Sequence, residues 1–416
     1  MQECVLDLPS LTRICRDLAW SELRSMPSVA GRLGTRTSAF ATIDWSSTGL
    51  ALDSLACMQM ATAGGTWCNA FETGYEDLFL AKRNVPAWAA GMHRVALSSG
   101  THITFSSSGT TGVRKHIRHR LSVLMDEARV WADLLSPPKS NAQGTSIKRV
   151  VVLAPTHHIY GFIWGVLLPM VLKVPVIDAD LEAFPELLAG DLVVAVPDQW
   201  TWLADAHHLL GRWPTEVKGV SSTAPLPAQV HRRLTDATGT ADAVATAPLA
   251  QLLHVYGSAE TAGLAWRDDP VQPYMLAAMR VRTLTDGIAL VRPPGDPIEL
   301  AIQDELSWVD HQHFHVVARI DQSVQVAGHN VSPAWVCAQF ASHPNVQEVA
   351  VRLNSSSHPP RLKAFIVLKQ ADQLYMRPQL ETWAHENLPW YANPASFTYG
   401  ASLPRSSMGK LCDWPD

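Results

Sequence analysis

A stretch rich in serine, threonine and glycine, residues 105–115, has the composition of a loop that binds an oxyanion. Its small side chains would let backbone N–H groups approach a phosphate, its hydroxyls would add donors, and Lys115 would add a positive charge. A strand-like run with Ile103 and Phe105 precedes it, and a basic segment compatible with a helix follows it. The spacing of a Walker loop is absent. Composition alone allows both a triphosphate loop and a flexible Ser/Gly linker.

Two further segments place histidine, tyrosine and glutamate where they could act on a ligand. Residues 155–161 read PTHHIYG, and residues 254–263 read HVYGSAETAG. The adjacent His157 and His158 could bind a metal, but adjacent side chains are expected to point apart and no third ligand is evident. Tyr256 and Gly257, taken alone, would ordinarily form only a turn.

A row of acidic and imidazole side chains, Asp310, His311, His313 and His315, offers a second metal hypothesis. On a strand, the three histidines would share one face and could bind zinc with a partner from elsewhere. A solvated strand face is the commoner explanation of such a row.

Residues 107–115, SSGTTGVRK, resemble the phosphate loop of the acyl-adenylate-forming superfamily, which includes acyl- and aryl-CoA ligases, adenylation domains and luciferases. Other segments resemble motifs of that superfamily in the same order, over about residues 100–416. Residues 155–160 are similar to its P-x-x-H-I-Y segment, 221–226 to S-G-A-A-P-L, 256–260 to Y-G-x-T-E, 318–321 to G-R-x-D, 328–333 to G-x-x-V-x-P and 403–410 to L-P-R-T-x-x-G-K. Arg114, Ala259 and Ala318 depart from these patterns, and the chain resembles a member shortened at its start.

The resemblance implies that the chain binds ATP, AMP and Mg²⁺. The implied nucleotide-binding residues are Ser107, Ser108, Gly109, Thr110, Thr111, Gly112, Lys115, Thr223, Ala224, Pro225, Tyr256, Gly257, Ser258, Asp304 and Arg319. The implied catalytic residues are Lys410, Glu260 as the Mg²⁺ ligand, and His158, and Asp321 would be a hinge. The implied substrate pocket contains His158, Tyr160, Gly161, Trp164, Ser222, Thr223, Gly257 and Gly263.

Alternating apolar strands and helices must position these residues. We expect strands at 149–154, 174–177, 192–196, 219–222 and 252–255, and helices at 122–135, 161–172, 199–210 and 228–234. Such alternation predicts an α/β fold with mainly parallel sheets flanked by helices, whose ligand sites lie at the carboxyl ends of the strands.

The remaining segments complete a two-domain expectation, with a large domain at 1–320 and a small α+β cap at 321–416. Residues 280–319 predict an antiparallel subdomain. In the cap we expect helices at 333–342 and 379–387 and strands at 348–353 and 363–368. Near the start of the chain, residues 50–60 predict a helix, Gly64 and Gly65 a turn, and Trp67 and Trp88 core positions.

Composition narrows the class of protein. A net charge of −5 without a strongly basic block argues against nucleic acid as the main partner. Six cysteines without a C-x-x-C pair are typical of reduced thiols in a cytoplasmic protein. The stretch 159–177 is apolar but is interrupted by Pro169, Lys173 and Pro175, so we expect no membrane span.

The resemblance implies ATP-dependent activation of an aromatic carboxylic acid, 3- or 4-hydroxybenzoate, followed by transfer to the phosphopantetheine thiol of an acyl carrier protein. Residues 261–267, TAGLAWR, look particularly like the ligases of aryl-polyene and xanthomonadin pigment clusters, and this likeness favours an aromatic acid. An aryl- or short/medium-chain acyl-CoA ligase is the alternative. A nucleotide-binding sensor or scaffold that has lost catalysis is a rival of another class.

Overall fold

The computed structural model describes residues 6–26, 29, 33, 44–45, 50, 52–99, 102–107, 115–136, 146–206, 213–214, 216–236, 249–283, 287–290, 298–320, 323–354, 357, 359–369, 376–404 and 411–414. The chain divides into two compact units. The first contains Met1–Ser106, His116–Ile302 and Leu306–His315, and the second contains Ser107–Lys115, Gln303–Glu305 and Val316–Asp416.

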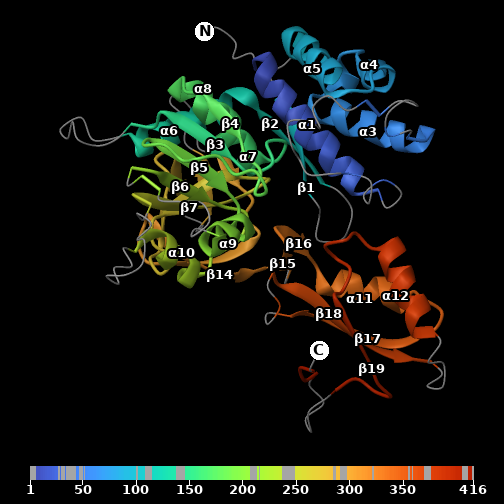
Figure 1. Ribbon diagram of the computed structural model, residues 1–416. Helices are drawn as coiled ribbons and strands as arrows, with labels where there is room; N and C mark the ends of the chain where they lie inside the picture. The colour runs from blue at the N-terminus through green and yellow to red at the C-terminus, as the bar shows by residue number, and fades with distance from the viewer. Residues whose placement is uncertain are drawn as a thin grey trace. The chain divides into compact units, whose positions relative to one another are not determined.

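A nine-stranded mixed sheet organises the first unit (Figure 1), in the order β13-β14-β9-β8-β7-β6-β5-β3-β4. Strands β4, β3, β5, β6 and β7 are parallel, and β8, β9 and β14 continue the sheet in antiparallel pairs. The expectation of parallel strands is therefore confirmed for five of the nine strands of one large sheet. The strands are β3 (Arg149–Val152), β4 (Val176–Asp178), β5 (Asp191–Ala195), β6 (Lys218–Ser221), β7 (Gln251–Ser258), β8 (Ala262–Arg267), β9 (Tyr274–Leu276), β13 (Asp304–Trp308) and β14 (His313–Arg319).

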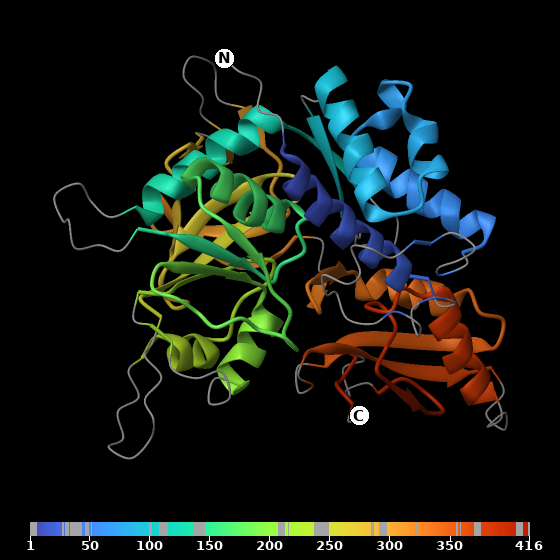
Figure 2. The ribbon, with the colours of Figure 1, turned by 45° about the horizontal axis from the view of Figure 1, so that its top comes forward.

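Helices cover both faces of the parallel strands because alternate strand residues face opposite sides. Val150 and Val152 pack into one hydrophobic core and Val151 and Leu153 into another. Figure 2 shows the sheet between two groups of helices. One group is α6 (Leu121–Leu135), α7 (Ile159–Phe162), the π-helical turn Ile163–Leu167 and α8 (Leu168–Leu172), and the other is α9 (Pro197–Ala206) and α10 (Ala228–Thr235).

The N-terminal part of the first unit is helical, with α1 (Leu8–Arg24), α3 (Ser54–Trp67), α4 (Glu76–Ala81) and α5 (Val85–Ser99). The predicted turn at Gly64 is wrong, because this glycine lies inside α3. A Cβ there would lie 2.8 Å from the ring of Phe79, so the glycine permits close helix packing. Trp67 and Trp88 are buried, which confirms their predicted place in the core.

Strands β1 (His102–Ser107) and β2 (Lys115–Arg120) form a separate two-stranded sheet. The expectation that the basic segment after residue 114 is compatible with a helix is therefore wrong. Ile117 and His119 are half-buried while their neighbours in β2 are exposed, and this alternation is the pattern of a strand. The predicted antiparallel subdomain is smaller than expected. Its sheet consists of β10 (Arg280–Arg282), β11 (Ile288–Leu290) and β12 (Ile298–Leu300), because β13 and β14 join the large sheet.

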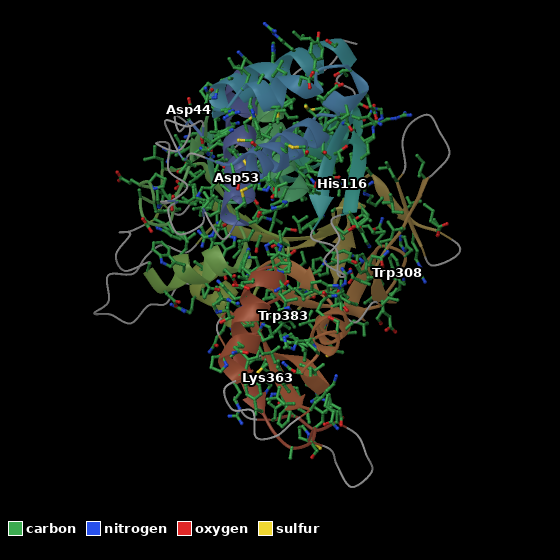
Figure 3. The ribbon with its side chains drawn as sticks, turned by 90° about the vertical axis from the view of Figure 1, so that its right-hand side faces the viewer. Asp44, Asp53, His116, Trp308, Lys363 and Trp383 are labelled. Atoms are coloured by element: carbon green, nitrogen blue, oxygen red, sulfur yellow. The ribbon has the colours of Figure 1, made fainter. Side chains whose placement is uncertain are left out.

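The second unit has its own core and an α+β arrangement, and the predicted helices and strands of residues 333–387 are confirmed. The core gathers Val336, Phe340, Leu362 and Ile366. Lys363 and Trp383, labelled in Figure 3, belong to its sheet and to its second helix. The elements are β15 (Val324–Val326), β16 (His329–Val331), α11 (Pro333–Ala341), β17 (Val346–Asn354), β18 (Arg361–Leu368), α12 (Met376–Asn387) and β19 (Ser396–Tyr399).

None of the helices in the described part of the chain combines the length and the apolar character needed to cross a bilayer.

Candidate active site

The segments after β3, after β6 and at the end of β7 meet at one edge of the sheet. Strand β5 lies between β3 and β6, and β6 pairs with β7 in parallel, with Ser221 opposite His254. The Ser222 hydroxyl donates to the Val255 carbonyl at 2.8 Å. The Tyr160 hydroxyl lies 2.7 Å from the Val220 carbonyl oxygen and 3.1 Å from that of Ala195. These bonds bring the predicted residues Tyr160 and Ser222 to the carboxyl edge.

The turn after β6 is strained at a predicted contact residue. Thr223 is exposed and has a φ of +80°, which is unfavourable for a β-branched side chain. Ala224 is half-buried and Pro225 exposed. Strain of this kind gathers at ligand sites, where the surrounding structure enforces it.

Buried polar contacts fix the segment 155–161. The Asp17 carboxylate of α1 accepts hydrogen bonds from the backbone N–H and the hydroxyl of Thr156, both at 2.8 Å. Arg16 pairs with Asp17 at 2.9 Å and with Asp178 at 3.0 Å. A Cβ at Gly161 would lie 2.1 Å from the Pro155 carbonyl oxygen, so only glycine fits there. The N-terminal helix therefore positions the start of the predicted pocket.

The histidines of this segment lie differently from the expectation. The rings of His157 and His158 are 4.0 Å apart between centroids and tilted by 40°, so the prediction that they point apart is wrong. His158 is exposed at the N-cap of α7, whereas His157 is buried. Trp164 is buried against Trp131, with ring centroids 5.4 Å apart.

Tyr256, near the end of β7, belongs to an aromatic cluster. Its ring centroid is 5.5 Å from that of Tyr274 and 5.6 Å from that of Phe314. The Tyr256 residue is half-buried. At Gly257, a Cβ would lie 2.0 Å from the Ala262 carbonyl oxygen, so this glycine lets β7 and β8 approach each other closely.

Glu260 lies on the turn between β7 and β8 and is half-buried. The Thr261 hydroxyl oxygen accepts from the Ser258 N–H at 3.0 Å, and the Ser258 hydroxyl accepts from the Thr261 N–H at 3.2 Å. His119 Nε2 lies 2.7 Å from the Ala259 carbonyl oxygen. A carbonyl oxygen can only accept, so Nε2 carries the proton. Burial lowers the pKa of His119, which favours the neutral ring.

The buried side chains of Glu127 and Arg280 form an ion pair next to the β7–β8 turn. Arg280 Nη2 is 3.0 Å from a Glu127 carboxylate oxygen, and both side chains are almost fully buried. The other Glu127 oxygen accepts from the Trp131 indole at 3.0 Å and from the Gly263 N–H at 2.9 Å. The Arg280 guanidinium also donates to the carbonyls of Thr261 and Gly263. Burial raises the pKa of the Glu127 carboxyl, and Arg280 opposes the shift.

Two predicted ribose-side residues come together where β13 begins and β14 ends. Arg319 Nη1 lies 3.8 Å from an Asp304 carboxylate oxygen, and both side chains are partly exposed. The two residues that the resemblance assigns to the ribose are therefore neighbours in the fold.

Several predicted residues have limited or no description. Ser107 ends β1, and Lys115 begins β2 as an exposed residue. Outside the described residues lie Ser108, Gly109, Thr110, Thr111, Gly112, Asp321 and Lys410. The zinc hypothesis is not supported, because His311 lies in a turn before β14, and His313 Nδ1 is 2.9 Å from the Asp310 carboxylate. Among the described residues, no group of three metal-ligating side chains gathers.

Sequence reasoning missed the polar residues that hold the site: Asp17, His119, Glu127 and Arg280. One signal was available for Glu127, which lies on the apolar stripe of its helix with Leu124 and Trp131. A charged residue on such a stripe needs a partner.

Comparison with known proteins identifies the family of the chain. The AMP-binding enzyme family matches residues 98–287. A 4-coumarate–CoA ligase of Halorhodospira halophila is 35% identical, with 86% of this chain and 87% of the relative covered. A 4-coumarate–CoA ligase of Cereibacter sphaeroides is 33% identical, with 88% and 84% covered.

Solved structures share the fold at lower identity. An o-succinylbenzoate CoA synthetase from Bacillus subtilis has a TM-score of 0.55 at 16% identity, with 74% of this chain and 67% of that chain covered. A malonyl-CoA ligase has a TM-score of 0.52 at 18% identity, with 73% and 71% covered. Because long stretches match its relatives in sequence, the chain belongs to the AMP-binding, acyl-adenylate-forming enzymes and is an acid–thiol ligase.

Proposed function

We propose that this ligase activates an aromatic carboxylic acid with ATP and transfers the acyl group to the thiol of CoA. The observation that carries the proposal is the identity of 35% to a 4-coumarate–CoA ligase over 86% of this chain. Two further relatives with similar coverage carry the same name. CoA is therefore better supported as the acceptor than the acyl carrier protein, and a hydroxycinnamate such as 4-coumarate joins the hydroxybenzoates as a substrate.

The reaction has two displacements. A substrate carboxylate oxygen bonds to the α-phosphorus of ATP while the bond to pyrophosphate breaks. The CoA thiolate then bonds to the acyl carbon while the bond to AMP breaks. The first step needs charge neutralisation and in-line positioning rather than a strong base, because a carboxylate is already ionised at neutral pH.

The nucleotide roles are inferred from the resemblance of the motifs to those of the family. Residues 107–112 and Lys115 would hold the phosphates, Tyr256 would stack on adenine, and Asp304 with Arg319 would hold the ribose. Lys410 would bind the reacting α-phosphate and carboxylate oxygens in the first step.

The residues at the β7–β8 turn fit a magnesium ion. Mg²⁺ prefers oxygen ligands and often takes only one or two carboxylates together with phosphate oxygens. Glu260 offers such a carboxylate, and among the described residues it forms no ion pair. Mg²⁺ bound there would neutralise charge on the triphosphate.

We also propose that the two domains have different roles. Residues 1–320 would form the large domain that binds the acid and ATP. Residues 321–416 would form a small mobile domain that turns about Asp321, presenting Lys410 for adenylation and withdrawing it for thioester formation.

Carboxylate-dependent ATP–pyrophosphate exchange tests the proposal with 4-coumarate, cinnamate, 3- and 4-hydroxybenzoate and octanoate. We expect exchange with one or more aromatic acids and a fall of orders of magnitude in Lys410→Ala and Glu260→Ala. Exchange with octanoate alone would replace the aryl assignment with an aliphatic one. Nucleotide binding without exchange for any acid would favour the sensor or scaffold.

A further inference from the structure

We infer that His119 is a positioning residue for Glu260, and that it acts through a hydrogen bond to the backbone of the β7–β8 turn. This inference rests on the proposed role of Glu260 as the Mg²⁺ ligand. It adds a residue from β2 to a site otherwise built at the end of β7.

The His119 ring is held on two sides. Its centroid lies 5.9 Å from that of Phe105 on the partner strand β1, in an edge-on arrangement, and Phe105 is itself buried. Its Nε2–H donates to the Ala259 carbonyl at 2.7 Å. Ala259 directly precedes Glu260, so this bond fixes the peptide plane from which the Glu260 backbone continues.

The other hydrogen bonds of the β7–β8 turn leave its middle to be fixed by His119. Ser258 and Thr261 form hydrogen bonds with each other across the turn, and the Arg280 guanidinium donates to the Thr261 carbonyl at 3.1 Å. These bonds hold the two ends of the turn. His119 supplies the contact at Ala259, between those ends.

His119 lies close in the chain to the predicted phosphate loop. It lies four residues after Lys115, on the strand that follows the predicted phosphate loop. Figure 3 labels His116 on the same strand. One hydrogen bond therefore joins the strand that begins with Lys115, the proposed phosphate-binding lysine, to the turn that carries Glu260, the proposed Mg²⁺ ligand. Outer contacts of this kind orient metal ligands, and their loss typically lowers metal affinity or activity by about 10- to 100-fold.

Other roles for His119 fit the geometry less well. Its Nε2 is occupied by the carbonyl, so that nitrogen is not offered to a metal ion. A general base is not required for an ionised carboxylate. A positioning role uses the contact that the ring makes.

Three variants test the inference: His119→Leu removes the donor, His119→Gln keeps an N–H donor of similar reach, and His116→Leu removes a neighbouring exposed histidine. Two quantities are measured against Mg²⁺ concentration: the rate of ATP–pyrophosphate exchange, and calorimetric binding of a non-hydrolysable ATP analogue. Melting temperatures show which variants are folded. If His119→Leu unfolds, His119→Phe takes its place, because it keeps the ring contact with Phe105.

We expect His119→Leu to need about tenfold more Mg²⁺ in both assays, with His119→Gln and His116→Leu close to the unchanged protein. An unchanged Mg²⁺ requirement in a folded His119→Leu protein would overturn the inference. An equal rise in His119→Gln and His119→Leu would also overturn it, because packing alone would then explain the effect. Absence of exchange in the unchanged protein would instead refute the proposed function, and the binding titration would still report on His119.

Discussion

The buried pair of Glu127 and Arg280 should be strongly coupled in stability. Their side chains are 0% and 1% exposed, and 3.0 Å separates the charged atoms. Glu127→Leu leaves the Arg280 guanidinium buried without a carboxylate, and Arg280→Met leaves the Glu127 carboxylate without a cation. Breaking a buried pair on one side typically lowers the free energy of unfolding by about 3–5 kcal/mol.

The structure refines that magnitude for each partner. Arg280 keeps its bonds to the carbonyls of Thr261 and Gly263 after Glu127→Leu, but the Gly263 N–H and the Trp131 indole each lose their acceptor. The free-energy cost of leaving the guanidinium buried without a carboxylate is thus reduced. Two donors, however, lose hydrogen bonds that are worth roughly 1 kcal/mol each. We expect about 4 kcal/mol for either single variant.

A double-mutant cycle supplies the assay. In Glu127→Leu/Arg280→Met no buried charge is left unpaired, so the loss should fall short of the sum of the singles by at least about 2 kcal/mol. Urea unfolding followed by tryptophan fluorescence measures each variant. Arg129→Met is the matched control, because its partner Asp126 lies on the same helix and both side chains are about half exposed. Its loss should stay below about 1 kcal/mol. Additive single effects below about 1 kcal/mol each would show that Glu127 and Arg280 are not strongly coupled.

Three further predictions concern other parts of the chain. His254 lies 2.8 Å from His231 between ring nitrogens, and burial, then His231 and Arg267, lower its pKa to about 3. The unfolded chain binds this proton more readily, so stability should fall as pH drops from about 6.5 toward 3, and His254→Gln should reduce the decline in acid unfolding curves. Asp17→Ala should lower the free energy of unfolding by about 3 kcal/mol or more, and Asp17→Asn by less, because the amide oxygen still accepts from Thr156. Trp414 is buried against Phe365, with centroids 5.7 Å apart, and its carbonyl accepts from Lys363 at 2.5 Å. Trp414→Ala should destabilise the second unit by about 3 kcal/mol in thermal unfolding, and a loss below about 1 kcal/mol would contradict that packing.

The parallel strands were predictable because burial on both faces leaves a continuous apolar run. Residues 150–153 are such a run, and they alternate between the two cores. Residues 115–120 carried no comparable signal. Their basic side chains alternate only in exposure, which depends on the partner strand β1, so the sequence allowed a helix.

The positions of the candidate site residues were predictable where these residues lie close together in the chain. Tyr256, Gly257 and Glu260 lie in one motif, and the structure places them together on β7 and the turn after it. The supporting contacts are non-local: Glu127 and Arg280 are 153 residues apart, and Asp17 and Thr156 are 139 apart. Spacing within a motif cannot pair such residues, because their proximity arises only from the fold.

The product formed from 4-coumarate, ATP, Mg²⁺ and CoA, identified by mass, tests the proposed function. We predict a 4-coumaroyl-CoA thioester together with AMP and pyrophosphate, or the corresponding thioester of another aromatic acid from the exchange panel. Adenylation of an aromatic acid that proceeds to a carrier-protein thiol but never to CoA would contradict the assignment of the acceptor. Failure to adenylate any aromatic acid would contradict the proposed activation of an aromatic acid.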